Sequence, residues 1–172
     1  MIALVTGGSG SGKSAYAEAL AASLPGTPHI YLATMQTYDD DETRGRIARH
    51  RAMRDDKGFK TVEQPMDLAS APVPEGSCVL LECLPNLIAN EMFDGGQIQR
   101  IVPALDALMK RCASLIVVTD DVFADGKSYP EGTTAWLRCL TKIAAHVATK
   151  ADLMVEVVCG IPIVVKGQDP CV

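Results

Sequence analysis

The first twenty residues constrain the fold more than any other stretch of the chain. Residues 2–5 are an uncharged apolar run, which is typical of a strand buried on both faces. The segment GGSGSGKS at residues 7–14 matches G-x-x-x-x-G-K-[ST] at every position, and a good helix-forming segment follows it. Strand, glycine-rich loop and helix in this order predict a phosphate-binding loop (P-loop).

The chemistry of this loop follows from its residue types. Glycines allow backbone conformations closed to residues with a Cβ, so successive N–H groups can bind phosphate oxygens, aided by the N-terminus of the following helix. Lys13 supplies a cation for the β- and γ-phosphates, and Ser14 supplies a hydroxyl ligand for Mg²⁺. The alternative is a glycine- and serine-rich turn without a ligand. We expect nucleotide contacts from Gly7, Gly8, Ser9, Gly10, Ser11, Gly12, Lys13 and Ser14.

Composition narrows the class of protein. At 172 residues the chain is expected to form one domain, 1–172, with a substantial core. A net charge of -5 argues against a general nucleic-acid binder, because no basic excess is available to neutralise phosphates. No apolar run approaches the roughly 20 residues of a membrane span, and the N-terminal strand does not look like a signal peptide. The six cysteines include no C-x-x-C pair, so we expect a cytoplasmic protein with reduced thiols.

Hydrophobic periodicity places further elements along the chain. It predicts strands at residues 29–34, 78–83 and 114–119, and helices at 84–93, 97–112 and 133–150. Two final strands, 152–159 and 161–166, are expected to form a hairpin across Gly160. The pattern predicts an α/β fold, a P-loop NTPase-like three-layer sandwich with a mostly parallel central sheet and an antiparallel C-terminal edge.

The residues at the ends of the expected strands lie at the edge where parallel sheets bind ligands. Thr34, Met35 and Gln36 end the second strand, and Asp120 and Asp121 end the fourth.

The strand before residue 83 ends in an acid, Glu82. This position can bring a carboxylate beside the Mg²⁺ of a P-loop site, although an acid there can also cap the next segment. The acidic cluster at residues 39–42 is interpreted mainly as a helix cap, with metal or ribose contact as the alternative.

A basic segment, RGRIARHRAMR at residues 44–54, stands out in this acidic chain. On a helix, Arg46, His50 and Arg54 share one face because they are spaced four residues apart. Forked arginine donors suit a polyphosphate, and a neutral imidazole is a competent nucleophile near pH 7. From these residues alone, a solvated basic helix face with an incidental histidine is the favoured interpretation.

Several blocks of residues together indicate a family. They are LVTGG and SGKS within residues 4–14, YLAT at 31–34, R-I-x-x-H-x-x-x-R at 46–54, TVE at 61–63, and LLECL at 80–84 with Asn90. On these blocks the chain resembles the bifunctional adenosylcobinamide kinase/adenosylcobinamide-phosphate guanylyltransferase family of cobalamin biosynthesis, over nearly its whole length.

The resemblance implies two reactions that use ATP or GTP and Mg²⁺. The family phosphorylates the aminopropanol hydroxyl of adenosylcobinamide, and then passes GMP from GTP, through a GMP–histidine phosphoramidate, to adenosylcobinamide phosphate. His50 matches that histidine. The resemblance also implies a homo-oligomer, a trimer in the family. The further nucleotide contacts expected are Thr34, Met35, Gln36, Arg46, Arg51, Arg54, Glu63 and Glu82, with Ser14 and Glu82 as metal ligands.

The C-terminal third departs from the family's pattern. Where the family usually has N-E-V-G, residues 120–123 read DDVF. Pro130-Glu131 matches the start of the family's P-E-x-R element, but Gly132-Thr133 follows, without the arginine. Phe59 stands where the family commonly has tryptophan. Two alternatives to a bifunctional enzyme therefore stay open: a P-loop small-molecule kinase without guanylyl transfer, and a non-catalytic nucleotide-binding regulatory protein.

Overall fold

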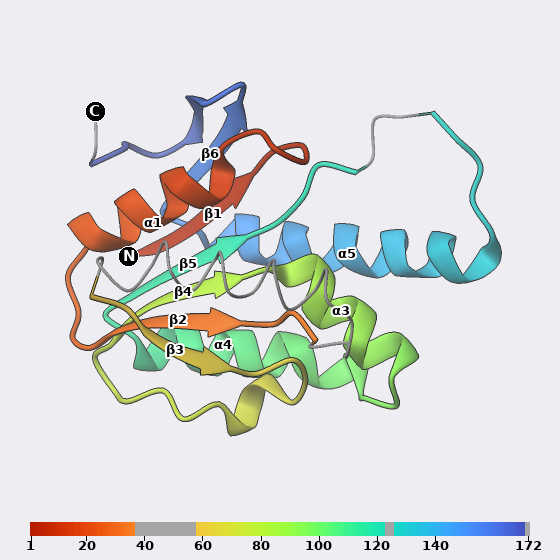
Figure 1. The fold of residues 1–172 in the computed structure, drawn as a ribbon, viewed down its shortest axis with the longest axis horizontal. Helices are drawn as coiled ribbons and strands as arrows, with labels where there is room; N and C mark the ends of the chain where they lie inside the picture. Colours follow the sequence, from red (N-terminus) through yellow and green to blue (C-terminus); the bar gives the residue numbers. More distant parts are fainter. Residues whose placement is uncertain (37–57, 123–125, 171–172) are drawn as a thin grey trace, which may run out of the picture.

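The computed structural model describes residues 1–36, 58–122 and 126–170. Its strands form one seven-stranded sheet in the order β3-β2-β4-β5-β1-β6-β7 (Figure 1). Every neighbouring pair is parallel except β6 and β7, so the expected mostly parallel sheet with an antiparallel C-terminal edge is confirmed. The strands are β1 Ile2–Thr6, β2 His29–Ala33, β3 Lys60–Glu63, β4 Cys78–Glu82, β5 Ser114–Val118, β6 Leu153–Val158 and β7 Ile161–Lys166.

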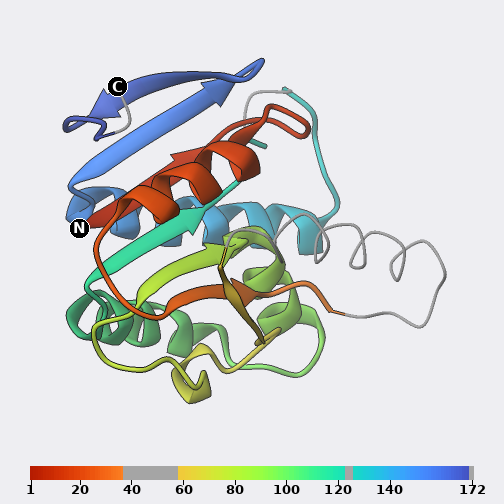
Figure 2. The ribbon, with the colours of Figure 1, turned by 60° about the vertical axis from the view of Figure 1, so that its left-hand side comes forward.

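Helices cover both faces of the sheet. The helix α1 (Lys13–Ser23) packs on one face, and α3 (Leu84–Phe93), α4 (Ile101–Arg111) and α5 (Glu131–Lys150) pack on the other (Figures 1 and 2). The expected three-layer sandwich is therefore confirmed. No helix in the described ranges is long and apolar enough to cross a membrane.

Two helices begin at other residues than the sequence predicted. The segment predicted as one helix over residues 97–112 is divided into a 3₁₀ turn, Ile98–Arg100, and the helix α4. The last helix begins at Glu131, two residues before the predicted start, directly after Pro130. Proline fixes the backbone in a conformation that suits the entry to a helix, which explains the earlier start.

The central strands carry the core. All five residues of β5 are buried, as are Ala3, Leu4 and Val5 of β1. Successive side chains point to opposite faces of a strand, so Leu4 packs toward α3, α4 and α5 while its neighbours pack toward α1. Burial on both faces is why these strands are continuous apolar runs in the sequence.

The last two strands form the expected hairpin. Cys159 and Gly160 connect them with φ angles of 49° and 80°, the left-handed pair that a two-residue type I′ turn requires. The strand β7 runs along the outer edge of the sheet (Figure 2). It carries several exposed apolar side chains, Ile161, Ile163, Val164 and Val165.

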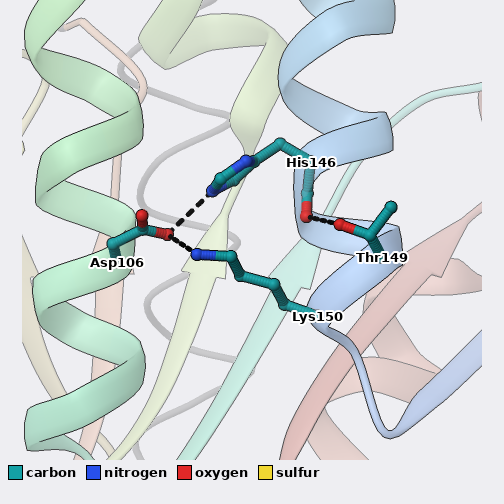
Figure 3. A network of polar contacts seen from close by, with 4 residues as sticks. All are labelled: Asp106, His146, Thr149 and Lys150. Carbon is teal, nitrogen blue, oxygen red and sulfur yellow. Dashed lines mark hydrogen bonds and ion pairs between the residues drawn. The ribbon is translucent and has the colours of Figure 1, made fainter.

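A polar cluster joins α4 to α5. The Nε2 atom of His146 and the Nζ atom of Lys150 both donate to Oδ1 of Asp106, each at 2.8 Å (Figure 3). The hydrogen bonds from Lys150 and then His146 hold the pKa of Asp106 below its ordinary value. Thr149 completes the cluster by donating its hydroxyl to the backbone carbonyl of His146. His146 is therefore engaged in a contact between two helices.

Candidate functional site

The P-loop connects β1 to α1 at the carboxyl edge of the sheet. Gly12 caps the helix with a φ of 92°, in the left-handed region that favours glycine. At Gly7 a Cβ atom would lie 2.5 Å from the carbonyl oxygen of Val157, so the close approach of β6 also requires glycine there. The turn itself is closed by the backbone N–H of Ser11, which donates to Gly8 O at 3.1 Å. The conformation of the loop therefore depends on glycines at two positions and on a hydrogen bond within its own backbone.

Lys13 is held at the loop by two acceptors. Its ammonium donates to Gly8 O at 3.1 Å and forms an ion pair with Oδ1 of Asp120 at 2.7 Å. Asp120 reaches the lysine because it follows β5, the parallel neighbour of β1, and the carboxyl ends of the two strands share one edge. The sequence indicated that Asp120 lies at the ligand edge, but not that it would pair with Lys13.

Ser14 and Glu82 are brought together by the first turn of α1 and the end of β4. The Ser14 hydroxyl donates to Oε1 of Glu82 at 2.7 Å. The second oxygen of this carboxylate, Oε2, is buried and has no hydrogen-bond partner within the described residues. Burial raises the pKa of Glu82, and the Ser14 hydrogen bond and the charge of Lys13 only partly oppose this effect. When Glu82 is ionised, its Oε2 atom is therefore a buried oxygen without a hydrogen-bond donor among the described residues.

This arrangement fits Mg²⁺. A serine hydroxyl from the P-loop and a carboxylate from a nearby strand are the protein ligands that P-loop sites use for this ion. Within the described residues no cluster of three or more His, Cys, Asp or Glu side chains could hold a metal. Mg²⁺ would therefore take its remaining oxygens from phosphate and water, which is its usual behaviour in nucleotide sites.

Thr34, whose expected nucleotide contact stays a prediction, has a structural role. Its side chain is fully buried, and its hydroxyl both donates to Cys83 O at 2.7 Å and accepts from Cys83 N at 2.8 Å. Asn90 adds a second link, because its amide donates to Thr34 O at 2.8 Å and to Pro65 O at 2.9 Å. Thr34 and Asn90 hold the ends of β2, β3 and β4 in place, a role that periodicity could not predict.

Cys83, a further possible nucleophile, and two of the expected nucleotide contacts lie close to this edge of the sheet. Burial raises the pKa of the Cys83 thiol to about 12, so this cysteine stays protonated beside the site. Met35 and Gln36 are half-buried and continue from Thr34 at the carboxyl edge of the sheet.

Glu63 ends the edge strand β3, and β2, β4 and β5 lie between it and β1. Four strand spacings amount to roughly 20 Å, so Glu63 lies away from the P-loop, and its expected nucleotide contact stays a prediction. The expected contacts Arg46, Arg51 and Arg54, the histidine His50 and the acidic cluster at 39–42 lie outside the described residues.

One cavity is lined by the P-loop, and a second lies beside Asp120. One, of about 360 Å³, lies between residues 8–11 of the loop and the turn at Cys159, where Gly160 N donates to Ser11 O at 2.8 Å. The other, of about 310 Å³, extends from Asp120 along α5. The two cavities share Asp121 and Glu156 in their linings, so they are neighbours at the carboxyl edge of the sheet.

Comparison with known proteins identifies the family. The model of the CobU family, described as cobinamide kinase / cobinamide phosphate guanyltransferase, matches residues 3–165. The chain belongs to this family.

The chain is 36% identical over 141 residues to the bifunctional adenosylcobalamin biosynthesis protein CobU of Escherichia coli K12, covering 71% of this chain and 76% of the relative. It is 33% identical over 189 residues to the protein of the same name from Salmonella typhimurium LT2, covering 96% of this chain and 100% of the relative. It is 30% identical over 172 residues to the bifunctional adenosylcobalamin biosynthesis protein CobP of Pseudomonas aeruginosa, covering 96% of this chain and 97% of the relative.

A solved structure supports the fold. The flagellar accessory protein FlaH from Methanocaldococcus jannaschii matches with a TM-score of 0.54 over 97% of this chain and 78% of that chain. The two sequences are 14% identical, so the likeness concerns the fold alone.

Proposed function

We propose that this chain phosphorylates adenosylcobinamide and then transfers GMP from GTP to adenosylcobinamide phosphate, in cobalamin biosynthesis. The observation that carries the proposal is the family match over residues 3–165, on a chain whose P-loop lysine and serine meet Asp120 and Glu82 at one sheet edge. ATP or GTP would serve as the phosphate donor, and GTP as the source of GMP.

In the kinase step, the loop N–H groups and Lys13 bind the triphosphate, and Lys13 exchanges Asp120 for phosphate oxygens. The acceptor hydroxyl oxygen forms a bond to the γ-phosphorus, while the bond from that phosphorus to the β–γ bridging oxygen breaks. The nucleoside diphosphate leaves and the hydroxyl proton passes to water. Ser14 and Glu82 would hold Mg²⁺, which when bound neutralises phosphate charge.

In the guanylyl step, a ring nitrogen of His50 attacks the α-phosphorus of GTP, and the bond to the α–β bridging oxygen breaks to release pyrophosphate. An oxygen of adenosylcobinamide phosphate then displaces the imidazole, so the P–N bond breaks and GMP is transferred. Arg46 and Arg54 are each four residues from His50 in sequence, and Arg51 is adjacent to it; their charges would stabilise the leaving pyrophosphate.

Labelling with α-³²P GTP and Mg²⁺ tests this mechanism. The wild-type protein is expected to take up label through a P–N bond that survives alkali and hydrolyses in acid. His50→Ala should take up no label while its kinase activity largely persists, because γ-phosphoryl transfer does not use the imidazole. His29→Ala and His146→Ala are the matched controls, since their side chains bond to Ala21 O and to Asp106. Label retained in His50→Ala would refute the role of this histidine.

The same experiment separates the alternatives that the divergent residues 120–123 leave open. Phosphorylation of adenosylcobinamide by a protein that takes up no label would indicate a kinase alone. Stoichiometric GTP binding without either transfer would indicate a nucleotide-binding regulatory protein.

A further inference from the structure

The cavity of about 310 Å³ beside Asp120 has apolar walls and a polar end. Leu4 of β1 and Met154 of β6 face Ala144 and Ala148 of α5 across it. Its polar residues lie at the carboxyl ends of β1, β5 and β6, the edge that carries the P-loop. They are Thr6, Thr119, Asp120, Asp121 and Glu156.

Thr119 gives this cavity an unused hydrogen-bonding group. The residue is 4% exposed, and its hydroxyl oxygen is buried without a hydrogen-bond partner in the described part of the chain. Its backbone N–H donates to Val5 O at 2.9 Å, so the residue is anchored where β1 and β5 meet. A buried hydroxyl without a partner is destabilising unless a bound molecule satisfies it.

Charge decides which ligand suits the cavity. The carboxylates of Asp120, Asp121 and Glu156 accept hydrogen bonds from hydroxyl and amide groups, and no Lys or Arg is among the lining residues in the described part of the chain to hold a phosphate. Size points the same way, since about 310 Å³ is at the small end of ligand pockets and excludes a whole corrinoid.

Proximity links the cavity to the phosphates. Asp120 lines the cavity, and its carboxylate lies 2.7 Å from the ammonium of Lys13. We propose that the cavity binds the hydroxyl-bearing amide arm of the acceptor, with the corrin ring outside, and that Thr119 is a hydrogen-bonding residue for this arm. The inference rests on the proposed function, and it assigns the acceptor side of the same site.

Thr119→Val removes the hydroxyl and keeps the shape of the side chain. We expect the KM for adenosylcobinamide to rise about five- to tenfold, the loss expected for one hydrogen bond to a bound ligand. The Kd for GTP should stay within about twofold, because the carboxylate-lined cavity does not hold the nucleotide. The Tm should be unchanged or higher, since an unsatisfied buried hydroxyl is removed. A lower Tm with an unchanged KM would show a merely structural threonine and overturn the proposal.

Ala148→Leu tests the cavity by filling it. Ala148 is half-buried on α5, so the larger side chain can be accommodated by occupying the cavity, and the KM for adenosylcobinamide should rise at least about tenfold. Ala22→Leu, at an exposed position of α1, is the matched control and should leave the KM unchanged.

The outcomes separate this inference from the proposed function. A wild-type protein that phosphorylates adenosylcobinamide, with wild-type KM in both Thr119→Val and Ala148→Leu, would overturn the cavity assignment and leave the function standing. A wild-type protein that binds GTP but does not phosphorylate adenosylcobinamide would overturn both.

Discussion

At the scale of single residues, Lys13 shows how the P-loop is prepared for phosphate. Its ammonium is 2.7 Å from Asp120 and 3.1 Å from Gly8 O, so it already lies against the loop backbone. We predict that Lys13→Ala lowers kcat/KM for phosphoryl and guanylyl transfer together by about 100-fold or more, because both use a triphosphate in this loop. Steady-state assays of the two half-reactions would measure this loss.

The matched control for Lys13 is Lys142→Ala, which removes a lysine from an exposed position of α5. It should leave both rates unchanged. Turnover near the wild-type rate in Lys13→Ala, for either reaction, would contradict the assignment of the loop.

As a proposed Mg²⁺ ligand, Glu82 should make metal binding depend on pH. Its pKa is raised in the folded state, chiefly by burial, so the stability contributed by its protonated form is present at low pH and is lost as pH rises through the folded-state pKa. We predict that Glu82→Gln raises the Tm at neutral pH and raises the Mg²⁺ requirement roughly 10- to 100-fold. Thermal scans across pH and Mg²⁺ titrations of kinase activity would measure both effects.

Mg²⁺ binding should also become tighter as pH rises and Glu82 ionises, and Glu82→Gln should abolish that dependence. Glu75→Gln, in an exposed loop, is the matched control. An unchanged Mg²⁺ requirement in Glu82→Gln would remove this residue from the metal site.

At the scale of elements, Asp106 of α4 is the contact to test, because it accepts from His146 and Lys150 of α5. The pKa of Asp106 is lowered, so its contribution to stability is present above the unfolded-state pKa of about 3.9 and is lost as pH falls through the folded-state value. We predict that Asp106→Asn destabilises the protein near neutral pH by no more than about 1 kcal/mol, since the cluster is partly exposed.

Urea unfolding of the wild type and Asp106→Asn over a range of pH would measure the contribution of this cluster. The two free energies of unfolding should converge at low pH, where the carboxylate is protonated. A difference that persists there would show that packing, and not charge, connects the helices.

At the scale of the whole molecule, β7 is an edge strand with exposed apolar side chains, among them Ile161 at 66% and Val165 at 57% exposure. Exposed apolar edges are sites where chains associate. We predict a homo-oligomer, a trimer by family resemblance, with β7 at the contact. Light scattering coupled to gel filtration should give a mass above that of one chain, 18.3 kDa, and Ile163→Lys should lower it.

Phe93→Lys is the control for the oligomer, because it changes an exposed apolar side chain, 58% exposed, at the end of α3. It should leave the mass unchanged. A wild-type protein that stays at one chain mass at every concentration would contradict the prediction.

Local features of this protein could be predicted from the sequence. The glycines of the P-loop, the buried strands and the turn at Cys159 and Gly160 depend on residues close together in the chain, and the motif and periodicity predicted them. The meeting of Ser14 with Glu82 also followed, because one general rule places the carboxyl ends of parallel strands at a common edge.

Other contacts between residues distant in the chain depend on the tertiary structure. The strand order places β5 beside β1, so Asp120 pairs with Lys13, whereas Glu63 ends an edge strand far from the loop. The side chain of Thr34 turns inward to the Cys83 backbone, and the cavity under Asp120 forms where α5 crosses β1 and β6. Hydrophobic periodicity is a property of one element at a time, so it contains neither the order of strands in the sheet nor the direction of a side chain at a strand's end.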